Sequence, residues 1–421
     1  MKIFPGKKVP IQSFCKHPES GALEQAYNLS CLPFIFRFVG LMPDVHQGYG
    51  MPIGGVIGTQ GVVIPNAVGV DIGCGMCAVK TSLKEISTEQ LKAILGGSEE
   101  NQGGIRGLIP VGFNHHKKAQ DATLMPKVKD SERMIGNNGV LLVPNCFEYP
   151  IVSSQYSSAL KQLGTLGGGN HFIEIQKGDD GFIWIMIHSG SRNLGYKVAK
   201  HYNKVAQDLC KLWYSDIPDY KGEDGLAFLP IGTKEATDYL REMNYCLHFA
   251  YVSRRLMMER VLICFFAAII GTNSDWNSIS SMLDNMINIH HNYASLENHF
   301  GQNVWIHRKG ATSAKEGEIG IIPGSQGTSS YIVKGKGNRD SFMSCSHGAG
   351  RKMSRKKARN ELNLEQEQKM LNDQGILHAL RGKGGLDEAP GAYKDIDVVM
   401  EEQKDLVDIV VKLKPLAVVK G

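Results

Sequence analysis

The sequence has no long apolar run and no dense set of cysteines. Its longest apolar stretch, residues 261–270, is too short to cross the hydrocarbon core of a bilayer. The first residues, MKIFPGKKVPIQSF, carry lysines without an apolar run behind them, which argues against a secretory signal. Nine cysteines, an odd number without the close spacing of a disulfide framework, fit a reducing compartment. We therefore predict a cytoplasmic protein with no membrane partner.

Strong net charge, internal repeats and Pro- or Ser-rich linkers are also missing. The 47 Lys and Arg against 42 Asp and Glu leave a formal charge of +5, which permits a local basic patch for a polyanion but does not require one. A chain of 421 residues is long enough for a substantial core in one or two units. Because no segment has the composition of a linker, we predict a single domain over residues 1–421.

Glycine, in contrast, is abundant. The 48 glycines gather in clusters beside His, Asp, Cys, Asn and Ser, and they do not form a low-complexity tract. Such clusters are expected where the backbone must approach a ligand closely. The search for a functional site therefore begins at these clusters.

Hydrophobic spacing in the first half of the chain predicts strands. Residues 68–80 alternate between apolar and other side chains, which predicts a strand with Asp71 and Cys74 on opposite faces. A continuous apolar run at residues 182–187 predicts a buried strand that carries His188 at its end. The ends of buried strands commonly carry sites, so His188 becomes a candidate.

Helices are predicted mainly in the middle of the chain. Apolar residues spaced by three and four indicate an amphipathic helix over 194–212, and the stretches 234–270 and 282–289 are predicted as further helices. The polar, glycine-rich stretch 97–138 is predicted to be an exposed excursion. Together these patterns predict an α+β fold, with a compact mixed β-sheet core surrounded by helices and a mostly helical insertion at about 194–289.

The string VDIGCG brings two possible metal ligands close together. Asp71 and Cys74 pair a hard oxygen with a soft thiolate, a combination that fits zinc or manganese. The alternative is that Asp71 caps a turn and Cys74 is a small core residue. Cys77 is interpreted as structural.

Three histidines extend this candidate set. His171 follows three glycines in GTLGGGNHFIEI, and His188 opens HSGSRNLG. His291 in IHHNYASLENH is the third candidate. Its neighbour His290 is interpreted as a decoy that does not bind the metal, and His299 as a surface residue. One aspartate, one cysteine and three histidines leave room for two ions that share the thiolate. Two adjacent divalent ions neutralise charge on attacking and leaving oxygens, which favours a phosphate-transfer reaction.

His347 lies among small residues in SCSHGAGRKMSR, directly before a basic stretch that we predict to be a helix. From its spacing it can be a surface residue, a metal ligand or a nucleophile. Glycines before a basic helix form an anion site, and Arg351 and Arg355 would share a helix face at i and i+4. Arg308 and Lys309 in HRKGATSA form a second positive pair. Their positions favour phosphate binding over a merely solvated charge run.

At these strings the chain resembles the RtcB family of RNA-splicing ligases over nearly its whole length. The resemblance is carried by MPDVHQGYGMPIGGV, VGVDIGCGM, LGTLGGGNHFIEI, IHSGSRNLG, HHNYASLENHFG, RKGATSA, IIPGSQGTSSYIVKG, SCSHGAGR, AYKDIDVVM and VVKG. It implies an enzyme that uses GTP and two Mn²⁺ ions to join an RNA 3′-phosphate or 2′,3′-cyclic phosphate to a 5′-hydroxyl. It also implies that His347 attacks the α-phosphate of GTP and that the resulting histidine–GMP adduct passes GMP to the RNA 3′-phosphate.

The resemblance also assigns site residues by motif. The implied metal ligands are Asp71, Cys74, His171, His188 and His291, with Cys74 bridging. The implied nucleotide contacts are Asn170, Glu174, Arg192, Asn292, Pro323, Gly324, Ser325, His347, Gly348, Ala349, Gly350, Tyr393 and Lys420, with a guanine pocket formed by Glu174, Ser325, Tyr393 and Lys420. The implied RNA or phosphate contacts are Asp44, Arg308, Lys309, Arg351 and Arg355, and His46 would lie close to the centre.

Two other functions use the same residues. A two-metal phosphoesterase or nuclease acting on RNA ends would need the ligands but no covalent nucleotide. An RNA-binding protein would use the metal only to hold its structure. For the ligase we expect a monomer whose partner is RNA with these ends, and the sequence identifies no activating protein.

Overall fold

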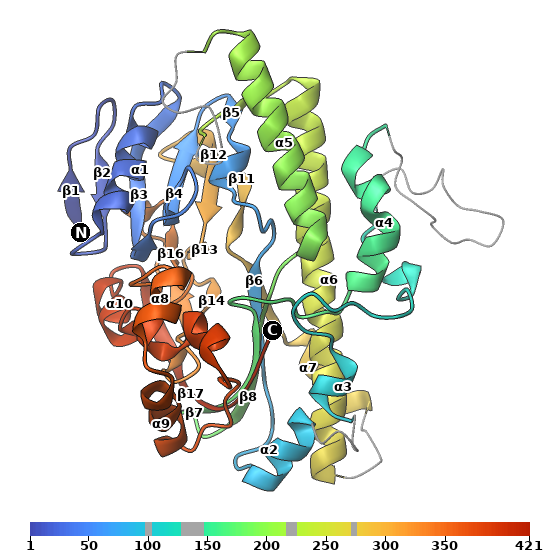
Figure 1. Cartoon of the computed structure of the whole chain (residues 1–421). Helices are drawn as coiled ribbons and strands as arrows, with labels where there is room; N and C mark the ends of the chain where they lie inside the picture. The colour runs from blue at the N-terminus through green and yellow to red at the C-terminus, as the bar shows by residue number, and fades with distance from the viewer. Residues whose placement is uncertain (97–102, 128–146, 216–224, 271–275) are drawn as a thin grey trace, which may run out of the picture.

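Two β-sheets form the centre of the protein, and helices lie on either side of them (Figure 1). The computed structural model describes residues 1–96, 103–127, 147–215, 225–270 and 276–421. The prediction of an α+β fold with a mixed β-sheet core surrounded by helices is confirmed. The cysteines in the described ranges are free. Within those ranges no helix is both long enough and apolar enough to cross a bilayer.

The first large sheet is mostly antiparallel, with one parallel pair between its second and third strands. In sheet order its strands are β1 (Lys2–Phe4), β2 (Ile11–Ser13), β3 (Ile35–His46), β4 (Ile53–Thr59), β12 (Gln302–Lys309) and β11 (Asn292–His299). Strands from the start of the chain thus pair with strands from its last third.

The second large sheet is antiparallel and carries most of the candidate ligands. In sheet order its strands are β10 (Ile287–His290), β6 (Gly75–Lys80), β8 (Ile183–Ser189), β7 (Phe172–Gly178), β17 (Val407–Lys420), β15 (Ser330–Gly335) and β14 (Ile319–Ile322). Two small sheets pair β13 (Ala311–Ser313) with β16 (Ser344–Ser346) and β5 (Val62–Val63) with β9 (Leu229–Pro230).

Helices and short 3-10 turns fill the connections. The helices are α1 (Ser20–Ser30), α2 (Thr88–Leu95), α3 (Ile105–Leu108), α4 (Pro150–Gln162), α5 (Arg192–Leu212), α6 (Lys234–Ile270), α7 (Trp276–Asp284), α8 (Arg355–Glu361), α9 (Leu364–Asp373) and α10 (Ile396–Glu402). The 3-10 turns include η1 (Pro65–Ala67), η2 (Ala122–Leu124), η4 (Arg339–Ser341), η5 (Lys383–Glu388) and η6 (Pro390–Ala392).

Both faces of the second sheet are covered, which explains the continuous apolar run of β8. Ile185 and Ile187 belong to the same buried cluster as Val261 of α6. The alternate residue Met186 faces the other way and packs in a cluster with Leu371 of α9. A strand buried on both faces needs apolar side chains at successive positions, so the prediction of a buried strand is confirmed.

The predicted helices over 194–212 and 234–270 are confirmed as α5 and α6, which run side by side in Figure 1. Leu194 and Val198 of α5 pack in one buried cluster with Tyr239 and Met243 of α6. The apolar stripe of an amphipathic helix is stabilised in this way by a partner stripe. Because α6 also packs against the second sheet through Val261, α5 is joined to that sheet through α6.

The predicted strand over 68–80 is too long. Pairing begins only at Gly75, and the residues before it form η1 and a turn in which the Cys74 amide donates to the Asp71 carbonyl at 3.1 Å. Gly69 and Gly73 adopt φ values of +95° and +73°, which are incompatible with a regular pleat. The prediction that Asp71 and Cys74 lie on opposite faces is therefore wrong, because the turn directs both side chains to one site.

Two other predictions need correction. The helix predicted over 282–289 is wrong beyond its first residues, because α7 ends at Asp284 and β10 then pairs with β6 at the sheet edge. A short apolar stretch is compatible with a helix or a strand, and here the pairing with β6 makes it a strand. The helix after His347 begins only at Arg355, so Arg351 precedes it and the two arginines share no helix face.

The excursion at 97–138 lies partly outside the described residues, and its described part includes exposed side chains such as Phe113.

Candidate metal and nucleotide site

The candidate ligands converge because neighbouring antiparallel strands of the second sheet have their ends on the same side. In the register of these strands Gly75 pairs with Ser189 and with His290, and Phe172 pairs with His188. The following strand ends therefore lie together: the start of β6, the start of β7, the end of β8 and the junction of β10 with β11. Cys74, His171, His188 and His291 lie at these ends.

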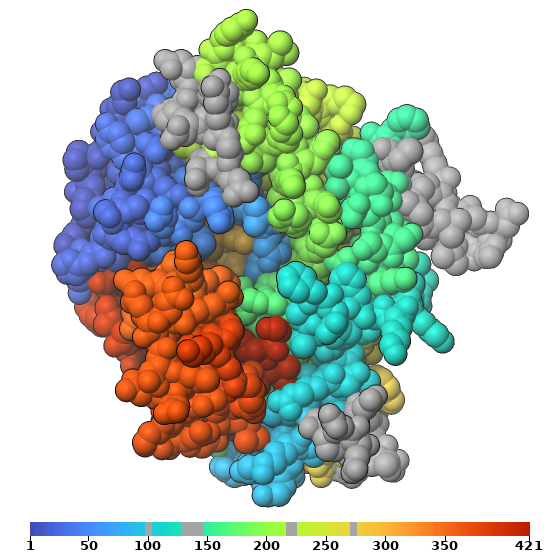
Figure 2. All heavy atoms as spheres, viewed as in Figure 1, coloured from blue at the N-terminus to red at the C-terminus, as the bar shows by residue number. Residues whose placement is uncertain are grey.

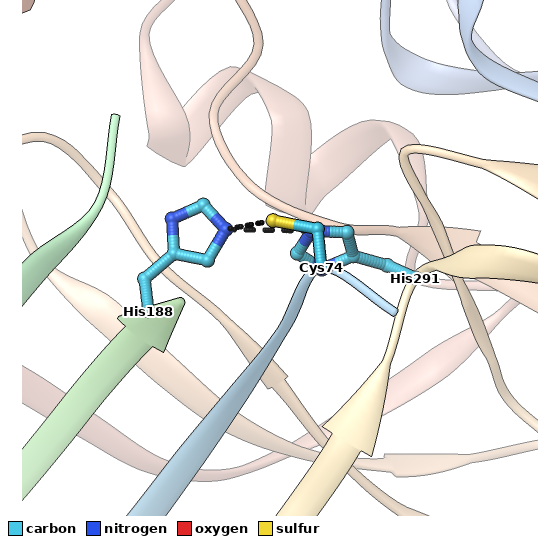
Figure 3. A group of neighbouring side chains, drawn as sticks. All are labelled: Cys74, His188 and His291. Carbon is cyan, nitrogen blue, oxygen red and sulfur yellow. Dashed lines mark hydrogen bonds between the residues drawn. The ribbon is translucent and has the colours of Figure 1, made fainter. Parts of the chain in front are cut away.

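The donor atoms form two overlapping groups. The Cys74 sulfur lies 3.3 Å from Nε2 of His188, which in turn lies 3.3 Å from Nε2 of His291 (Figure 3). On its other side the same sulfur lies 3.5 Å from Nε2 of His171, which lies 3.1 Å from a carboxylate oxygen of Asp71. Each trio has its donor atoms within 4.8 Å of one another, and Cys74 belongs to both.

Backbone carbonyls orient two of the imidazoles. Nδ1 of His171 lies 2.9 Å from the Leu166 carbonyl, and Nδ1 of His188 lies 3.0 Å from the Asn170 carbonyl. A carbonyl accepts only, so Nδ1 must carry the proton, and the lone pair of Nε2 faces the cluster. Nδ1 of His291 is buried and has no hydrogen-bond partner among the described residues. Burial also lowers the pKa of His188 and His291 well below the usual range, which keeps them neutral as ligands.

The cluster fits divalent cations. Burial and the neighbouring Asp71 raise the pKa of the Cys74 thiol well above its usual range, so the protein alone provides little to stabilise a thiolate. A bound cation supplies the missing positive charge and deprotonates a coordinating thiol. Gly190 makes room for the ligand loop, because a Cβ there would lie 2.3 Å from the Asp71 carboxylate. One thiolate, imidazoles and a carboxylate form a donor set of mixed softness that accepts several transition metals.

His347 stands beside this cluster and is held by Asp44. Its Nδ1 lies 2.6 Å from Oδ2 of Asp44, and its backbone amide donates to the same oxygen at 3.1 Å. Burial alone would raise the pKa of Asp44, but the charge and hydrogen bond of His347 bring it below the usual value. The ionised carboxylate fixes the proton on Nδ1 and leaves Nε2 as the lone-pair nitrogen. The His347 ring lies 4.8 Å, between centroids, from that of His291.

A cavity of about 320 Å³ opens at the cluster, a volume within the range of small-molecule sites. Figure 2 shows a hollow where the orange C-terminal surface meets the cyan surface around α3 and the green surface of α5. Most of the predicted nucleotide contacts line the cavity, namely Asn170, Glu174, Asn292, Pro323, Gly324, Ser325, His347, Gly348, Ala349, Gly350, Tyr393 and Lys420. His46, Lys309, Arg351 and Arg355 line it as well.

Glu174 lines this cavity and is only 2% exposed, and we call the buried part of the wall around it the closed end. Burial raises its pKa to about 8, although a hydrogen bond from Gln176 and the charge of Lys420 act in the opposite direction. Near neutral pH the carboxyl group of the empty cavity is therefore mostly protonated. A ligand that donates hydrogen bonds would favour the ionised form.

Glu388 of η5 connects the cationic residues of the cavity, and no motif or spacing in the sequence pointed to it. Its carboxylate lies 3.0 Å from Lys420 and 3.3 Å from Arg351, and it also bonds Arg355 and the Tyr393 hydroxyl. Burial would raise its pKa, but Lys420 and the other partners lower it to about 2. Glu388 is thus an ionised anchor for side chains from three separate segments.

Two arginines with predicted contacts lie outside the cavity lining. Arg192 donates to the Gly112 carbonyl at 3.2 Å and to the Thr165 hydroxyl at 3.3 Å. The hydrogen bond and charge of His171 lower the pKa of the nearby Asp71 against the effect of burial, and the charge of Arg192 adds to this. Arg308 is fully buried and forms an ion pair with Glu297. Its charge is satisfied inside the protein, which corrects the prediction of an RNA contact.

The same buried pair corrects the interpretation of His299. This side chain is buried, and its Nε2 lies 3.2 Å from the Glu297 carboxylate. The alternation of β11 directs it inward together with Glu297, so it is not a surface residue. His290 lies beside the cluster without joining either trio, as predicted, and its Nδ1 lies 3.1 Å from Arg254.

Arg254 of α6 is a buried residue that ties the ligand-bearing segments together. One of its terminal nitrogens donates to the carbonyls of Gly73 at 3.0 Å and Ser189 at 2.9 Å, the neighbours of Cys74 and His188. Its Nε donates to Asn288 of β10 at 2.7 Å. In the sequence, the one sign of this role is the position of the arginine among apolar residues of a long helix. The five donors of a guanidinium suit such a junction.

The fold and the cluster define the class: an α+β protein with a cysteine, histidine and aspartate site for metal ions at the wall of a cavity. A sequence model of the family described as tRNA-splicing ligase RtcB matches residues 25–421. The chain is 38% identical over 425 residues to the RNA-splicing ligase RtcB of Escherichia coli strain K12, which covers 100% of this chain and 99% of the relative.

Relatives of lower identity also match along most of their length. The tRNA-splicing ligase RtcB of Pyrobaculum aerophilum is 32% identical over 483 residues, with 100% of this chain and 96% of the relative covered. The RNA-splicing ligase RtcB homolog 1 of Entamoeba dispar is 33% identical over 465 residues, with 95% and 82% covered. The chain belongs to the RtcB family.

Replacing Cys74 by alanine is expected to weaken metal binding at both candidate groups, because they share its sulfur. The affinity for Mn²⁺, measured by titration calorimetry, should fall by at least about tenfold. Cys77→Ala is the matched control, since Cys77 is buried in the core three residues away and belongs to neither trio. Equal Mn²⁺ affinity of Cys74→Ala and the unaltered protein would contradict the shared-ligand arrangement.

Arg254→Met is expected to lower Mn²⁺ affinity by about 10- to 100-fold without touching a ligand, because the carbonyls beside Cys74 and His188 lose their common donor. Arg254→Lys should keep part of the affinity, since an ammonium can still reach one carbonyl. Arg255→Met, at the neighbouring and more exposed position, serves as the control. The idea fails if folded Arg254→Met, checked by circular dichroism, binds Mn²⁺ as the unaltered protein does.

Proposed function

We propose that the protein is an RNA ligase that joins a 3′-phosphate or 2′,3′-cyclic phosphate end to a 5′-hydroxyl end, with GTP and two Mn²⁺ ions as cofactors. The observation that supports it most directly is the Asp44–His347 pair beside the Cys/His/Asp cluster. The relatives named as RNA-splicing or tRNA-splicing ligases support the substrate class.

In this proposal His347 is the nucleophile. Asp44 holds the proton on Nδ1, so the lone pair of Nε2 is free to attack the α-phosphorus of GTP. An Nε2–P bond forms, the bond from phosphorus to the β-phosphate oxygen breaks, and pyrophosphate leaves. The imidazole gains positive charge in this step, and the buried carboxylate of Asp44 stabilises it. Bound divalent ions neutralise the charge on the phosphate oxygens.

The GMP group is then transferred to the RNA 3′-phosphate, and a further step joins the two RNA ends. An oxygen of the RNA 3′-phosphate attacks the phosphorus of GMP, and the bond to Nε2 breaks, which returns His347 to its starting state. The 5′-hydroxyl oxygen of the second RNA end attacks the activated 3′-phosphate, loses its proton and displaces GMP. A 2′,3′-cyclic phosphate would first be opened by water to a 3′-phosphate. The cavity keeps the reacting groups near His347 throughout.

The closed end of the cavity is the proposed guanine pocket. Guanine presents two N–H donors on one edge, and in this proposal the Glu174 carboxylate on the cavity wall accepts from them. Lys420 and Tyr393 stand near it, both tied to Glu388. We assign Arg351 and Arg355 to the phosphates or the RNA backbone, because both line the cavity and are held by Glu388.

The competing functions explain fewer features. A two-metal phosphoesterase would use the ligand cluster but would have no use for a histidine whose tautomer is fixed by a buried carboxylate. A purely structural metal site would not need to open into a cavity lined by Glu174, Lys420 and Arg351. For the ligase we retain the predictions of a cytoplasmic monomer with RNA as its partner.

Incubation with α-labelled GTP and Mn²⁺ is expected to label the protein through an acid-labile bond. His347→Ala should abolish the label, while His201→Ala, an exposed position on α5, should keep it. Asp44→Asn should slow labelling by about two to four orders of magnitude, because the wrong tautomer would be favoured. A hydrolase would turn over substrate without any label, and labelling of His347→Ala would rule out this nucleophile.

Binding of GMP in the absence of divalent cations is expected to strengthen as the pH rises. Glu174 must lose its proton to accept from guanine, and its pKa in the empty cavity is about 8. The dissociation constant should therefore fall by about tenfold per pH unit below that value and level off above it. Calorimetric titrations of Glu174→Gln should show weaker binding without this slope. A flat profile for the unaltered protein would exclude Glu174 as the guanine acceptor.

A further inference from the structure

We call the solvent-exposed part of the cavity wall its open end, and the side chains that form it are not among the proposed nucleotide contacts. Two apolar side chains on its wall are strongly exposed, Tyr49 at 57% and Val70 at 48%. Glu174, in contrast, marks the closed end and is almost fully buried. The metal ligands and His347 lie on the wall of the same cavity. A guanine at the closed end therefore leaves the open end for a second ligand.

The backbone around Tyr49 is fixed, although its ring is exposed. Gln25 of α1 exchanges two hydrogen bonds with the backbone of Gly48, at 2.6 and 3.0 Å. The Tyr49 carbonyl accepts from the Met51 amide at 2.8 Å and from the ammonium group of Lys309. The loop thus presents an aromatic ring to solvent from a defined position.

Lys309 also links this loop to the metal-ligand loop. Its ammonium group donates to the Asn66 carbonyl at 3.2 Å, and its aliphatic stem runs past Gly69, where a Cβ would lie 3.3 Å from it. Val70 and the ligand Asp71 follow directly in the chain. The ring of Tyr49 therefore belongs to a wall that continues into the metal site.

Within the described part of the chain, the ring of Tyr49 stacks on no other aromatic residue, pairs with no cation, and its hydroxyl makes no hydrogen bond. An aromatic ring held at the mouth of a nucleotide cavity has the chemistry to stack on a nucleobase. All four bases offer a π-face, so such a contact tolerates different sequences.

We propose that Tyr49, with Val70 on the same cavity wall, is a stacking platform for the base of the RNA nucleotide that carries the 3′-phosphate. The inference rests on the proposed ligase function and deepens it. The 3′-phosphate is the first RNA group that must reach His347, so its nucleotide is the one to be seated while GMP still occupies the closed end. The platform binds the base by its face and reads no hydrogen-bond edge.

The first test separates nucleotide transfer from RNA binding. Tyr49→Ala should raise the KM for the RNA 3′-phosphate end by about 5- to 150-fold, the range of one lost base stack. Tyr49→Phe should restore the KM, because the ring and not the hydroxyl makes the contact. Tyr27→Ala, at an exposed tyrosine on α1, is the matched control and should leave the KM unchanged. Formation of the GMP adduct by Tyr49→Ala shows that the fold and the cluster are intact.

The second test asks which base is stacked. An RNA whose 3′-terminal nucleotide lacks its base should bind the unaltered protein more weakly, and Tyr49→Ala should add no further loss with that RNA. Removing the base from the 5′-hydroxyl nucleotide should leave the effect of Tyr49→Ala intact. Additive losses at the 3′ nucleotide, or coupling to the 5′ nucleotide, would overturn the assignment.

Failure of the two proposals can be told apart. An unaltered protein that never forms a GMP adduct contradicts the ligase function itself. Adduct formation and RNA joining by Tyr49→Ala with an unchanged KM contradict only the stacking platform.

Discussion

The sulfur of Cys74 is the atom on which the rest of the site depends. It is the member common to both groups of donor atoms, and it lies where β6, β7 and β8 meet. A buried thiol with a raised pKa and buried neutral imidazoles are costly to assemble without a cation, because their polar atoms face one another and not water. The carbonyl partners of His171 and His188, and the guanidinium of Arg254, hold this arrangement in place.

Two buried carboxyl groups on the cavity wall differ because their surroundings differ. Glu388 is surrounded by Lys420, two arginines and a tyrosine hydroxyl, and it stays ionised. Glu174 accepts a hydrogen bond from the Gln176 amide and lies near the charge of Lys420. These two partners do not offset burial, so its pKa rises. The first carboxylate therefore organises positive charge inside the protein, whereas the second is available to a ligand that brings its own hydrogen-bond donors. Their environments set both roles, since the side chains are chemically the same.

The sequence predicted α5, α6 and the buried strand β8 because each has a strong hydrophobic period or an unbroken apolar run. It failed where glycines interrupt the pattern, as before β6, and where a short segment pairs at a sheet edge, as in β10. It also failed for His299 and Arg308, because an ion pair in the interior leaves no periodic trace in the sequence. The number of domains stays a prediction.

Which residue types carry the chemistry was determined by the sequence, through glycine-flanked Asp, Cys and His and through motifs shared with the RtcB family. The tertiary structure alone decided which of them meet, since residues 74 and 291 become neighbours only through strand register. It also decided the tautomer of His347, the charge of Glu174 and the supporting places of Arg254 and Glu388. These properties arise from burial and from partners distant in the chain, so no local pattern encodes them.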